Sequence, residues 1–576
     1  MIHTIHGTYY DWITTDPDPA VVADLCKLHN LTSVVAVVLI NRGIPTADIP
    51  HFLTPRLDEM SSVDAMPGLD KAIQRIHQAI TTQEKILVHG DYDCDGVTSA
   101  ALAVRALQGL SAQVVGYVPR RADGYDLQRA GVDEARRIGA TLIITTDCGV
   151  MAIDPVAYAK SFEIDVVITD HHRPGPSLPD AVAVVNPYLA EKQLPFPHLC
   201  GAGVIFRVLD AYIRMWQPEI QPAFRKNFAD LAAIGTVADV SPLTYDNRLI
   251  VSQGLQALRA NRKVGLAALY LALNLDPKTI TAQSIAFQIA PALNAAGRMG
   301  DPSIAFELLS TKDVDRAVDL ARQVKDLNDA RKVAMQDVVS EASVMAISPD
   351  VANHSVLVLH GKRWSKGIVG PVASKIVDLT GKPCIMLGFD HDLGLYVGSG
   401  RSTSEFNLLE ALHECKEWLT RYGGHHHAAG LSVSESNLDT FIGALQKAAS
   451  ALLPDTPTRP SLKIDAEISH AAAITENLPR ALEVLEPTGT GNLPAEFLTR
   501  GIKVVENRLG AGDTLLLSLQ LPGSSTPFKG IKFRAKDWHQ SIVVGQLIDI
   551  VYRPALNVFR GRTSVDLHLD DWRPSV

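Results

Sequence analysis

The chain has 576 residues, of which 46% are hydrophobic and 20% charged. The length exceeds that of one compact domain, and the composition excludes fibrous, collagen-like and disordered classes. The net charge of −9 at pH 7 counts mildly against a nucleic-acid binder. A site rich in metal-binding carboxylates would give the same sign, because its cations are not counted.

Cysteine usage and the N-terminus bear on the cellular compartment. The six cysteines are scattered and include no CxxC pair, which disfavours a zinc ribbon or a disulfide framework. The first residues lack a basic region followed by an apolar one, and the apolar run at 34–40 is too short to cross a bilayer. We expect a cytoplasmic protein with reduced thiols and no membrane association.

Residues 1–80 read as helical and irregular, and a regular alternation of strands and helices follows. Strands are predicted at 85–89, 113–118, 141–146, 165–169 and 181–185. Helices are predicted between them at 97–107, 127–138 and 152–161. This alternation indicates a parallel sheet with helices on both faces, in which ligands bind at the carboxyl ends of the strands.

The pattern of the remaining two thirds of the chain predicts three further structural sections. Residues 201–309 are mainly helical, and 311–347 form one long amphipathic helix, for which Ser310 with Asp313 would form the capping start. A second α/β section has predicted elements at 355–360, 368–379, 384–389, 395–399 and 408–418. After a linker at 453–461, five short strands predict a small barrel of the OB type, at 502–507, 514–520, 528–533, 545–552 and 564–569.

Carboxylates and histidines follow three strands of the first sheet. They are His89 at the end of the first strand with Asp91, Asp93 and Asp95 after it, Asp147 after another, and Asp170, His171 and His172 after a third. Gathered at one sheet edge, these carboxylates would repel one another and protonate unless cations neutralised them. Oxygen and nitrogen ligands suit Mn²⁺ best and Mg²⁺ also. Two such ions would support phosphoester hydrolysis.

The alternative interpretation is that each aspartate only caps the next helix. Asp91 is the weakest member of the set and fits a cap or a supporting role. Three strand ends in one sheet, two of them with histidine, are difficult to explain by capping alone. Cys94 and Cys148 alternate away from the aspartates and are interpreted as packing residues.

Four segments, 88–96, 145–149, 169–172 and 234–240, resemble the successive motifs of the DHH phosphoesterase family. The resemblance implies two Mn²⁺ or Mg²⁺ ions, with Asp147 bridging them and His172 beside the scissile phosphate as a donor or proton carrier. The implied catalytic residues are Asp147, His171 and His172. The implied metal ligands are His89, Asp93, Asp95, Asp147, His171 and Asp239.

Six further segments resemble the RecJ-type exonuclease branch of that family: 199–203, 294–298, 364–370, 398–402, 423–430 and 486–492. This implies that Arg298, in a glycine-containing turn, holds a 5′-terminal phosphate together with Ser399 and Arg401. Gly424 and His425 would face the substrate. Without the resemblance, the favoured interpretation of each arginine is a surface side chain in a turn.

Two positions depart from the usual pattern of this branch. Ala292 stands where arginine is expected, and Ser365 stands where histidine is commoner. Neither position is an implied metal ligand. The departures leave the chemistry intact and bear on substrate contacts.

The expected fold is a multidomain α/β protein. We predict an N-terminal region (1–59), a DHH catalytic domain with a parallel sheet (60–310), the connecting helix (311–347), a smaller α/β DHH-associated substrate-binding domain (348–452) and an OB-like nucleic-acid-binding barrel (462–576). A cleft between the catalytic and substrate-binding domains would admit only unpaired strands. In the barrel, Tyr552, Arg553, Phe559, Arg560 and Arg562 are candidates for binding DNA.

The resemblance implies 5′ to 3′ hydrolysis of single-stranded DNA to mononucleotides, in recombination and repair, alongside a single-strand-binding protein and a helicase. A monomer is the default expectation. The alternatives are a DHH phosphodiesterase for short oligonucleotides or cyclic dinucleotides, a pyrophosphatase, and a non-catalytic scaffold. The added barrel favours a long polymer over a small substrate, and the intact aspartate and histidine set argues against a scaffold.

Overall fold

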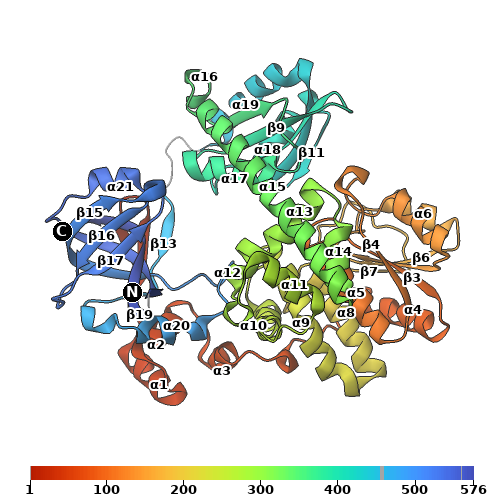
Figure 1. Ribbon diagram of the computed structural model, residues 1–576, viewed down its shortest axis with the longest axis horizontal. Coiled ribbons are helices and arrows are strands. Elements are labelled where there is room, and N and C mark those ends of the chain that lie inside the picture. The colour runs from red at the N-terminus through yellow and green to blue at the C-terminus, as the bar shows by residue number, and fades with distance from the viewer. Residues whose placement is uncertain (1, 454–458, 560, 576) are drawn as a thin grey trace. The chain divides into compact units, whose positions relative to one another are not determined.

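The computed structural model describes residues 2–453, 459–559 and 561–575 (Figure 1). It divides into two compact units. One unit comprises Ser61–Ser241 and Gly254–Thr458, and the other comprises Met1–Met60, Pro242–Gln253 and Arg459–Val576. The sequence did not indicate that the N-terminal and C-terminal regions share a unit. The finer domain boundaries stay predictions.

The first unit contains the predicted parallel sheet, with strand order β4-β3-β5-β6-β7. Its strands are β3 (Lys85–His89), β4 (Gln113–Tyr117), β5 (Leu142–Thr146), β6 (Asp165–Thr169) and β7 (Ala183–Val185). β5 is buried along its whole length, as expected for a central strand of a sheet covered on both faces. His89 pairs in register with Thr145, and Thr146 with Thr169. The segments that follow β3, β5 and β6 therefore start from one edge of the sheet.

Helices cover both faces of this sheet (Figure 1). On one face lie α4 (Leu69–Thr81), α5 (Cys94–Gly109) and α8 (Gly201–Trp216). On the other lie α6 (Arg129–Ile138) and α7 (Ile153–Lys160). Leu87, Ile143 and Ile168 bury their side chains in one apolar cluster with residues of α6 and α7. The burial of these aliphatic side chains fixes the sheet edge that carries the candidate site.

A helical section follows the sheet and leads into the predicted long helix. Its members are α9 (Gln221–Ala238), α10 (Tyr245–Arg259), α11 (Val264–Leu273), α12 (Ala282–Ser284), the π-helix η7 (Ile285–Ile289), α13 (Ala290–Met299) and α14 (Ser303–Ser310). The long helix is α15 (Val314–Ala346), which has 33 residues and is therefore ~50 Å long. It starts at Asp313, whose side chain accepts the N–H of Arg316. The suggestion that Ser310 takes part in this cap was wrong, because Ser310 ends α14.

The second α/β section has a five-stranded sheet of order β11-β12-β10-β9-β8. Its elements are α16 (Pro349–Ala352), β8 (Leu357–Gly361), α17 (Val369–Thr380), β9 (Cys384–Asp390), β10 (Leu395–Arg401), α18 (Leu408–Glu414), β11 (Arg421–Gly424), β12 (Ala428–Ser434) and α19 (Leu438–Leu452). α15 and α17 pack on one face, and α18 and α19 pack on the other. The strands β11 and β12 and the helix α19 were not predicted from the sequence, in which 423–430 served only as a family motif.

In the other unit, the first residues form a hairpin rather than the predicted helical and irregular segment. β1 (Ile2–His6) pairs with β2 (Asp11–Thr15), and β13 (Ser461–Lys463) adds to β2 in parallel. The buried carboxylate of Asp571 accepts the N–H groups of Tyr9 and Tyr10 and the Nε1–H of Trp12, the last at 2.8 Å. The partner that fixes the hairpin thus lies at the opposite end of the chain. Residues 454–458 of the predicted linker lie outside the described residues.

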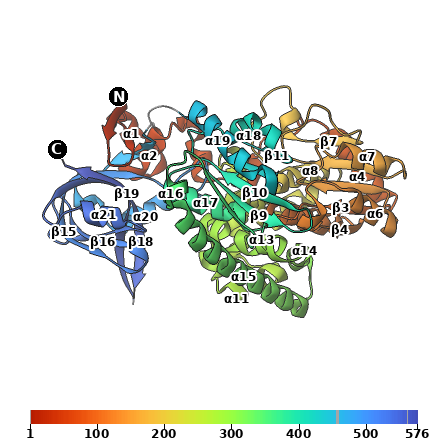
Figure 2. The same cartoon turned by 90° about the horizontal axis from the view of Figure 1, so that it is seen from above.

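The predicted barrel is confirmed. Strands β15, β16, β17, β19 and β18 follow one another, and the pairing of β15 with β18 closes the barrel (Figure 2). The strands are β14 (Ala466–Glu467), β15 (Phe497–Leu509), β16 (Leu515–Gln520), β17 (Phe528–Lys532), β18 (Leu547–Phe559) and β19 (Arg562–Pro574). The helices of this unit are α1 (Pro19–His29), α2 (Ser33–Asn41), α3 (Ile49–Leu53), α20 (Asn477–Leu482) and α21 (Lys536–Ser541). Residues of α1, α2 and α20 share one apolar core with the barrel.

Among the described residues, no single helix has both the length and the apolar composition needed to span a membrane. The bent pair α1 and α2 meets that test only when the two are taken together.

The contacts of Asp571 predict a large effect of its removal. In Asp571→Ala, three donors of the N-terminal hairpin would lose their acceptor, which we expect to cost about 3 kcal/mol. The thermal midpoint of this unit should fall by roughly 6–10 °C, measured by circular dichroism. Asp16→Ala is the matched control, because the Asp16 side chain is 82% exposed and pairs only with exposed His3. Equal midpoints for the two variants would contradict this account of the hairpin.

Candidate metal centre

The segment after β3 carries three aspartates into the start of α5. Asp93 is the N-cap of this helix, and its side chain accepts the N–H of Gly96 at 3.0 Å. Asp91 and Asp95 are buried, 3% and 2% exposed. The capping interpretation is therefore correct for Asp93, and the same residue also lies in the acidic cluster.

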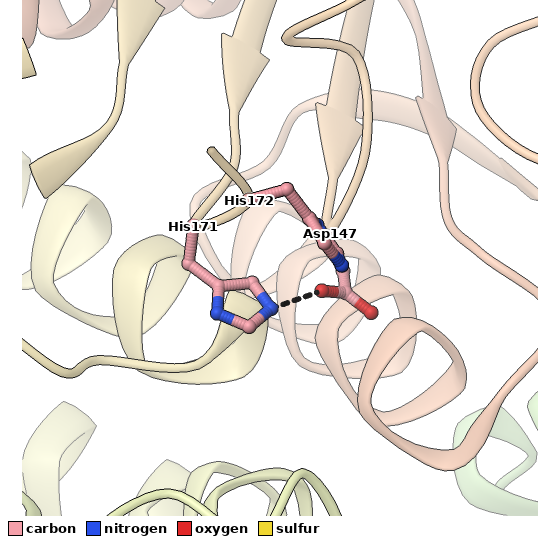
Figure 3. A group of neighbouring side chains, drawn as sticks. All are labelled: Asp147, His171 and His172. Atoms are coloured by element: carbon pink, nitrogen blue, oxygen red, sulfur yellow. Dashed lines mark ion pairs between the residues drawn. The ribbon is translucent and has the colours of Figure 1, made fainter. Parts of the chain in front are cut away.

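Three overlapping groups of side chains have ligand atoms within 4.8 Å of one another. They are Asp147 with His171 and His172, Asp95 with His171 and Asp239, and Asp91 with Asp93 and Asp147. Figure 3 shows the first group, in which His171 Nε2 lies 3.0 Å from Asp147 Oδ1. Asp147 and His171 each belong to two groups. The structure therefore brings together most of the residues that the sequence selected, from four segments of the chain.

Glycines allow two helices to approach these carboxylates. A Cβ atom at Gly201, the first residue of α8, would lie 2.3 Å from Asp147 Cβ. A Cβ at Gly235 in α9 would lie 2.4 Å from Asp95 Oδ1. The close approach lets the backbone N–H groups of Gly201 and Ala202 donate to the Asp95 carboxylate at 2.7 and 2.9 Å. The N-terminus of α8 thus holds Asp95 by hydrogen bonds and by its partial positive charge.

Burial and mutual repulsion oppose ionisation of the cluster. Burial, followed by the charges of Asp95 and Asp93, raises the pKa of Asp147 well above its usual value. Burial and then Asp93 raise the pKa of Asp91 in the same way. Burial raises the pKa of Asp239 to about 6, although His171 opposes the shift. These carboxylates can be ionised together only beside added positive charge.

The donor set fits divalent cations that prefer oxygen ligands. The three groups of described residues offer carboxylate oxygens and the imidazole nitrogens of His171 and His172, and none of them contains a cysteine. Asp91 Oδ1 is buried and has no hydrogen-bond partner among the described residues, so it is available to a cation. Oxygen-rich sites with some imidazole suit Mn²⁺ and Mg²⁺.

His172 is held separately, by Asp170. Its Nδ1 lies 2.8 Å from Asp170 Oδ1 and 3.0 Å from the Tyr125 hydroxyl. Burial alone would lower the pKa of His172, but the hydrogen bond and charge of Asp170 raise it to about 9. Asp170 also accepts the backbone N–H groups of Val150 and His171. The sequence pointed to Asp170 as part of the strand end but did not identify its function of orienting His172.

His89 lies beside the cluster and belongs to none of the three groups. It is 1% exposed, and Gly131 in α6 packs against its ring. Its Nδ1 lies 3.7 Å from Cys148 Sγ, and burial lowers its pKa to about 4. The expected function of His89 as a ligand stays a prediction. Cys94 and Cys148 are buried free thiols, in agreement with their interpretation as packing residues.

The predicted phosphate-binding residues lie on regular elements. Arg298 is in the last turn of α13 and not in a glycine-containing turn, and its Nη1 donates to the Gly367 carbonyl at 3.0 Å. The glycine before it, Gly297, is needed for packing, because a Cβ there would lie 2.3 Å from the Tyr92 carbonyl oxygen. Arg401 ends β10 and donates to Ser399 Oγ at 2.6 Å. Ser399 and Arg401 are therefore neighbours, as expected.

Gly424 and His425 lie where β11 turns into β12. Gly424 has φ of 142°, which a residue with a side chain rarely adopts. The His425 N–H donates to the Ala428 carbonyl at 2.7 Å. Partial burial, and then the positive charges of Arg173 and His172, lower the pKa of His425. The turn therefore lies within electrostatic range of His172.

The two departures occupy structural positions. Ala292 is fully buried in α13. Ser365 Oγ accepts the N–H of Gly367 at 3.3 Å. Ser365 thus stabilises the loop in which the Gly367 carbonyl accepts the hydrogen bond from Arg298.

The candidates for DNA binding in the barrel require correction. Tyr552 is fully buried and its hydroxyl contacts Thr499 at 3.0 Å, so it belongs to the barrel core and cannot stack on a base. Arg553 pairs with Asp570 at 2.8 Å. Arg562 is exposed. Arg560 and the side chain of Phe559 lie outside the described residues.

Family comparisons agree with this fold and cluster. The model of the DHH family, N-terminal domain, matches residues 85–236, which contain the parallel sheet and most of the acidic cluster. The DHHA1 domain model matches residues 353–451, and the RecJ OB domain model matches residues 464–571. The fold and the site thus define a DHH-type protein with two accessory domains.

Individual relatives cover most of the chain. The single-stranded-DNA-specific exonuclease RecJ of Bacillus subtilis (strain 168) is 34% identical over 97% of this chain and 70% of its own length. The Escherichia coli (strain K12) protein of the same name is 31% identical over 92% of this chain and 97% of its own length. The chain therefore belongs to the RecJ family.

Solved structures are also similar. A crystal structure of RecJ from Thermus thermophilus in complex with Mn²⁺ has a TM-score of 0.82 and 28% identity, covering 98% of this chain and 80% of that one. The same protein in complex with Mg²⁺ has a TM-score of 0.77 and 28% identity, covering 98% and 78%.

The close approach of α8 predicts that Gly201→Ala impairs cation binding. The added methyl group would displace Asp147 or the N–H groups that hold Asp95. Mn²⁺ should raise the melting temperature of the unaltered protein, and this rise should shrink by at least half in the variant. Gly443→Ala in α19, where a Cβ meets nothing within 4 Å, should keep the full rise. An undiminished Mn²⁺ effect in Gly201→Ala would refute the proposed tight fit.

Proposed function

We propose that this protein is a divalent-metal-dependent exonuclease that degrades single-stranded DNA from the 5′ end and releases mononucleotides. The observation that carries the proposal is the cluster of carboxylates and histidines at one edge of the parallel sheet, in a chain of the RecJ family. Two bound Mn²⁺ or Mg²⁺ ions would supply an activated water and stabilise the leaving oxygen.

The proposal assigns a function to each side chain of the cluster. Asp93, Asp95, Asp147, His171 and Asp239 are the ligands, with His89 a further candidate. Asp91 joins them as a ligand or as a charge beside them, because it is grouped with Asp93 and Asp147.

His172 is proposed to act on the reacting phosphate. Asp170 holds this side chain, and its hydrogen bond and charge raise the pKa of His172 to about 9 against the effect of burial. A protonated imidazole can donate a hydrogen bond to a phosphate oxygen or a proton to the leaving group.

The proposed polarity depends on a pocket for the 5′-terminal phosphate. Arg401 Nη1 donates a hydrogen bond to Ser399 Oγ. Arg298, on α13, donates one to the Gly367 carbonyl. Guanidinium groups bind phosphate by paired, charge-assisted hydrogen bonds. Gly424 and His425 would contact the strand near the scissile bond. The cleft that admits only unpaired strands remains part of this proposal.

The proposed setting is recombination and repair in the cytoplasm. Single-stranded DNA is the substrate, and a single-strand-binding protein and a helicase are the proposed partners. The six free cysteines in the described residues are compatible with a reducing compartment. We propose a monomer.

The proposed exonuclease activity can be measured directly. A long single strand labelled at either end, incubated with Mn²⁺ or Mg²⁺, should lose mononucleotides progressively from its 5′ end, and duplex DNA should be spared. The pair Asp93→Ala and Asp147→Ala should lower the rate at least about a thousandfold, because each removes a proposed ligand. EDTA should abolish the reaction.

Asp154→Ala is the control for these variants, since Asp154 is exposed in the first turn of α7. Retained activity in Asp147→Ala would refute the metal mechanism. Cleavage restricted to short oligonucleotides or cyclic dinucleotides would replace the proposed substrate class.

In the barrel, Arg562 remains as a candidate for binding DNA. It is exposed and, among the described residues, forms no ion pair with a carboxylate. If Arg562 neutralises one phosphate, Arg562→Gln should reduce the slope of log binding constant against log salt by about 0.7. Fluorescence anisotropy of the whole protein with a labelled oligonucleotide measures the slope. Lys160→Gln, at a 67% exposed side chain on α7, should leave it unchanged. An unchanged slope for Arg562→Gln would exclude this contact.

A further inference from the structure

The connecting helix α15 carries an arginine whose side chain is fixed in place. Asn328 Oδ1 accepts Arg331 Nη2 at 2.9 Å and Nε at 3.3 Å. Arg331 Nη1 lies 3.1 Å from Met335 Sδ. Asn328 itself is only 3% exposed. A buried amide therefore holds the half-buried guanidinium by two of its N–H groups and leaves others available.

The neighbours of Arg331 on α15 show which segment it faces. Leu327, one turn before Arg331, packs beside Gly300: a Cβ atom built on Gly300 would lie 3.4 Å from the Leu327 side chain. Met335, one turn after it, belongs to an apolar cluster that includes Ile368 and has Met299 packed against it. Residues one turn apart share one face of a helix. Arg331 therefore faces the end of α13, where Arg298 lies.

Three guanidinium groups from other elements lie within electrostatic range of Arg298, which makes four in this region. They are Arg121 after β4, Arg298 on α13, Arg331 on α15 and Arg401 on β10. Burial, and then the positive charge of Arg121, lower the pKa of Arg298 to about 10; Arg331 and Arg401 add to the shift, and the charge of Asp93 opposes it. Within the described part of the chain, none of the four forms an ion pair with a carboxylate. Four guanidinium groups that form no direct ion pair with a carboxylate favour binding of a multiply charged anion.

We infer that Arg331 is a specificity-determining residue that contacts the 5′-terminal phosphate, and that Asn328 is a positioning residue that orients it. This inference rests on the proposed function. A terminal phosphate carries nearly two negative charges at neutral pH, whereas an internal phosphodiester carries one. A pocket to which the connecting helix adds a further arginine therefore distinguishes a phosphorylated end from a hydroxyl end.

The test compares two labelled single strands that differ only in a 5′-phosphate or a 5′-hydroxyl. Binding is measured by fluorescence anisotropy in EDTA, so that no turnover is needed, and kcat and KM are measured separately with Mn²⁺. In the unaltered protein we expect tighter binding of the phosphorylated strand. Arg331→Gln should lower that preference by about tenfold or more, because binding of the phosphorylated strand should weaken much more than binding of the hydroxyl strand.

Companion variants separate recognition from helix stability. Arg331→Lys keeps the charge and loses the paired geometry, so it should retain part of the preference. Asn328→Ala should lose part of it, because the guanidinium is no longer held. Arg322→Gln is the control, since Arg322 lies on the same helix with a 70% exposed side chain paired to Asp319.

The outcomes are distinguishable. An equal loss for both strands in Arg331→Gln, or no loss, overturns the inference, as does an unaltered protein without preference for the phosphate. A lost preference in EDTA supports the inference even if no exonuclease activity is found with Mn²⁺, in which case only the proposed function fails. An effect of Arg322→Gln equal to that of Arg331→Gln would assign the result to the helix as a whole.

Discussion

The mutual repulsion of carboxylates gathered at one sheet edge is the constraint on which the rest of the structure depends. Asp91, Asp95 and Asp147 are almost completely buried, where ionised carboxylates are costly without compensating charge. Part of the compensation comes from the fold. The N-terminus of α8 donates two backbone N–H groups to Asp95, and His171 lies against Asp147. The remainder requires cations, so metal binding and the local fold are energetically coupled.

This constraint explains why glycines surround the site. Gly201 and Gly235 allow α8 and α9 to approach the carboxylates to distances at which a side chain would collide with them. Gly297 has the same function where α13 passes the segment after β3. Asp147 itself has φ of 65°, a conformation that aspartate tolerates better than most residues. The backbone near the site is thus shaped around the positions of a few oxygen atoms.

The connecting helix fixes side chains of the proposed phosphate pocket and also spaces the two α/β sections. α15 packs against α13, which carries Arg298, and against α17, which begins two residues after Gly367. Arg298 donates to the Gly367 carbonyl, and Arg331 is fixed by Asn328 on the same helix face. The positive charges of the proposed phosphate pocket are therefore positioned by helix packing, whereas the negative charges of the metal centre are positioned by strand register.

Local sequence determined the periodic elements and the candidate chemistry. Short apolar runs followed by Asp or His at 85–95, 142–147 and 165–172 predicted the parallel sheet and the acidic edge, because strand ends in such a sheet must meet. Heptad-like apolar spacing predicted α15 to within a few residues. The function of individual aspartates, and the assignment to one family branch, required the resemblance of whole motifs in addition to the residue pattern.

Tertiary structure alone decided what depends on distant partners. The hairpin at Ile2–Thr15 forms because Asp571 satisfies its N–H groups, and no local pattern reveals an acceptor at the other end of the chain. Tyr552 is a core residue because the barrel closes around it. Arg298 lies in a helix and Arg331 joins its surroundings for the same reason: an isolated arginine carries no periodic signal, and its environment is set by elements that become neighbours only on folding.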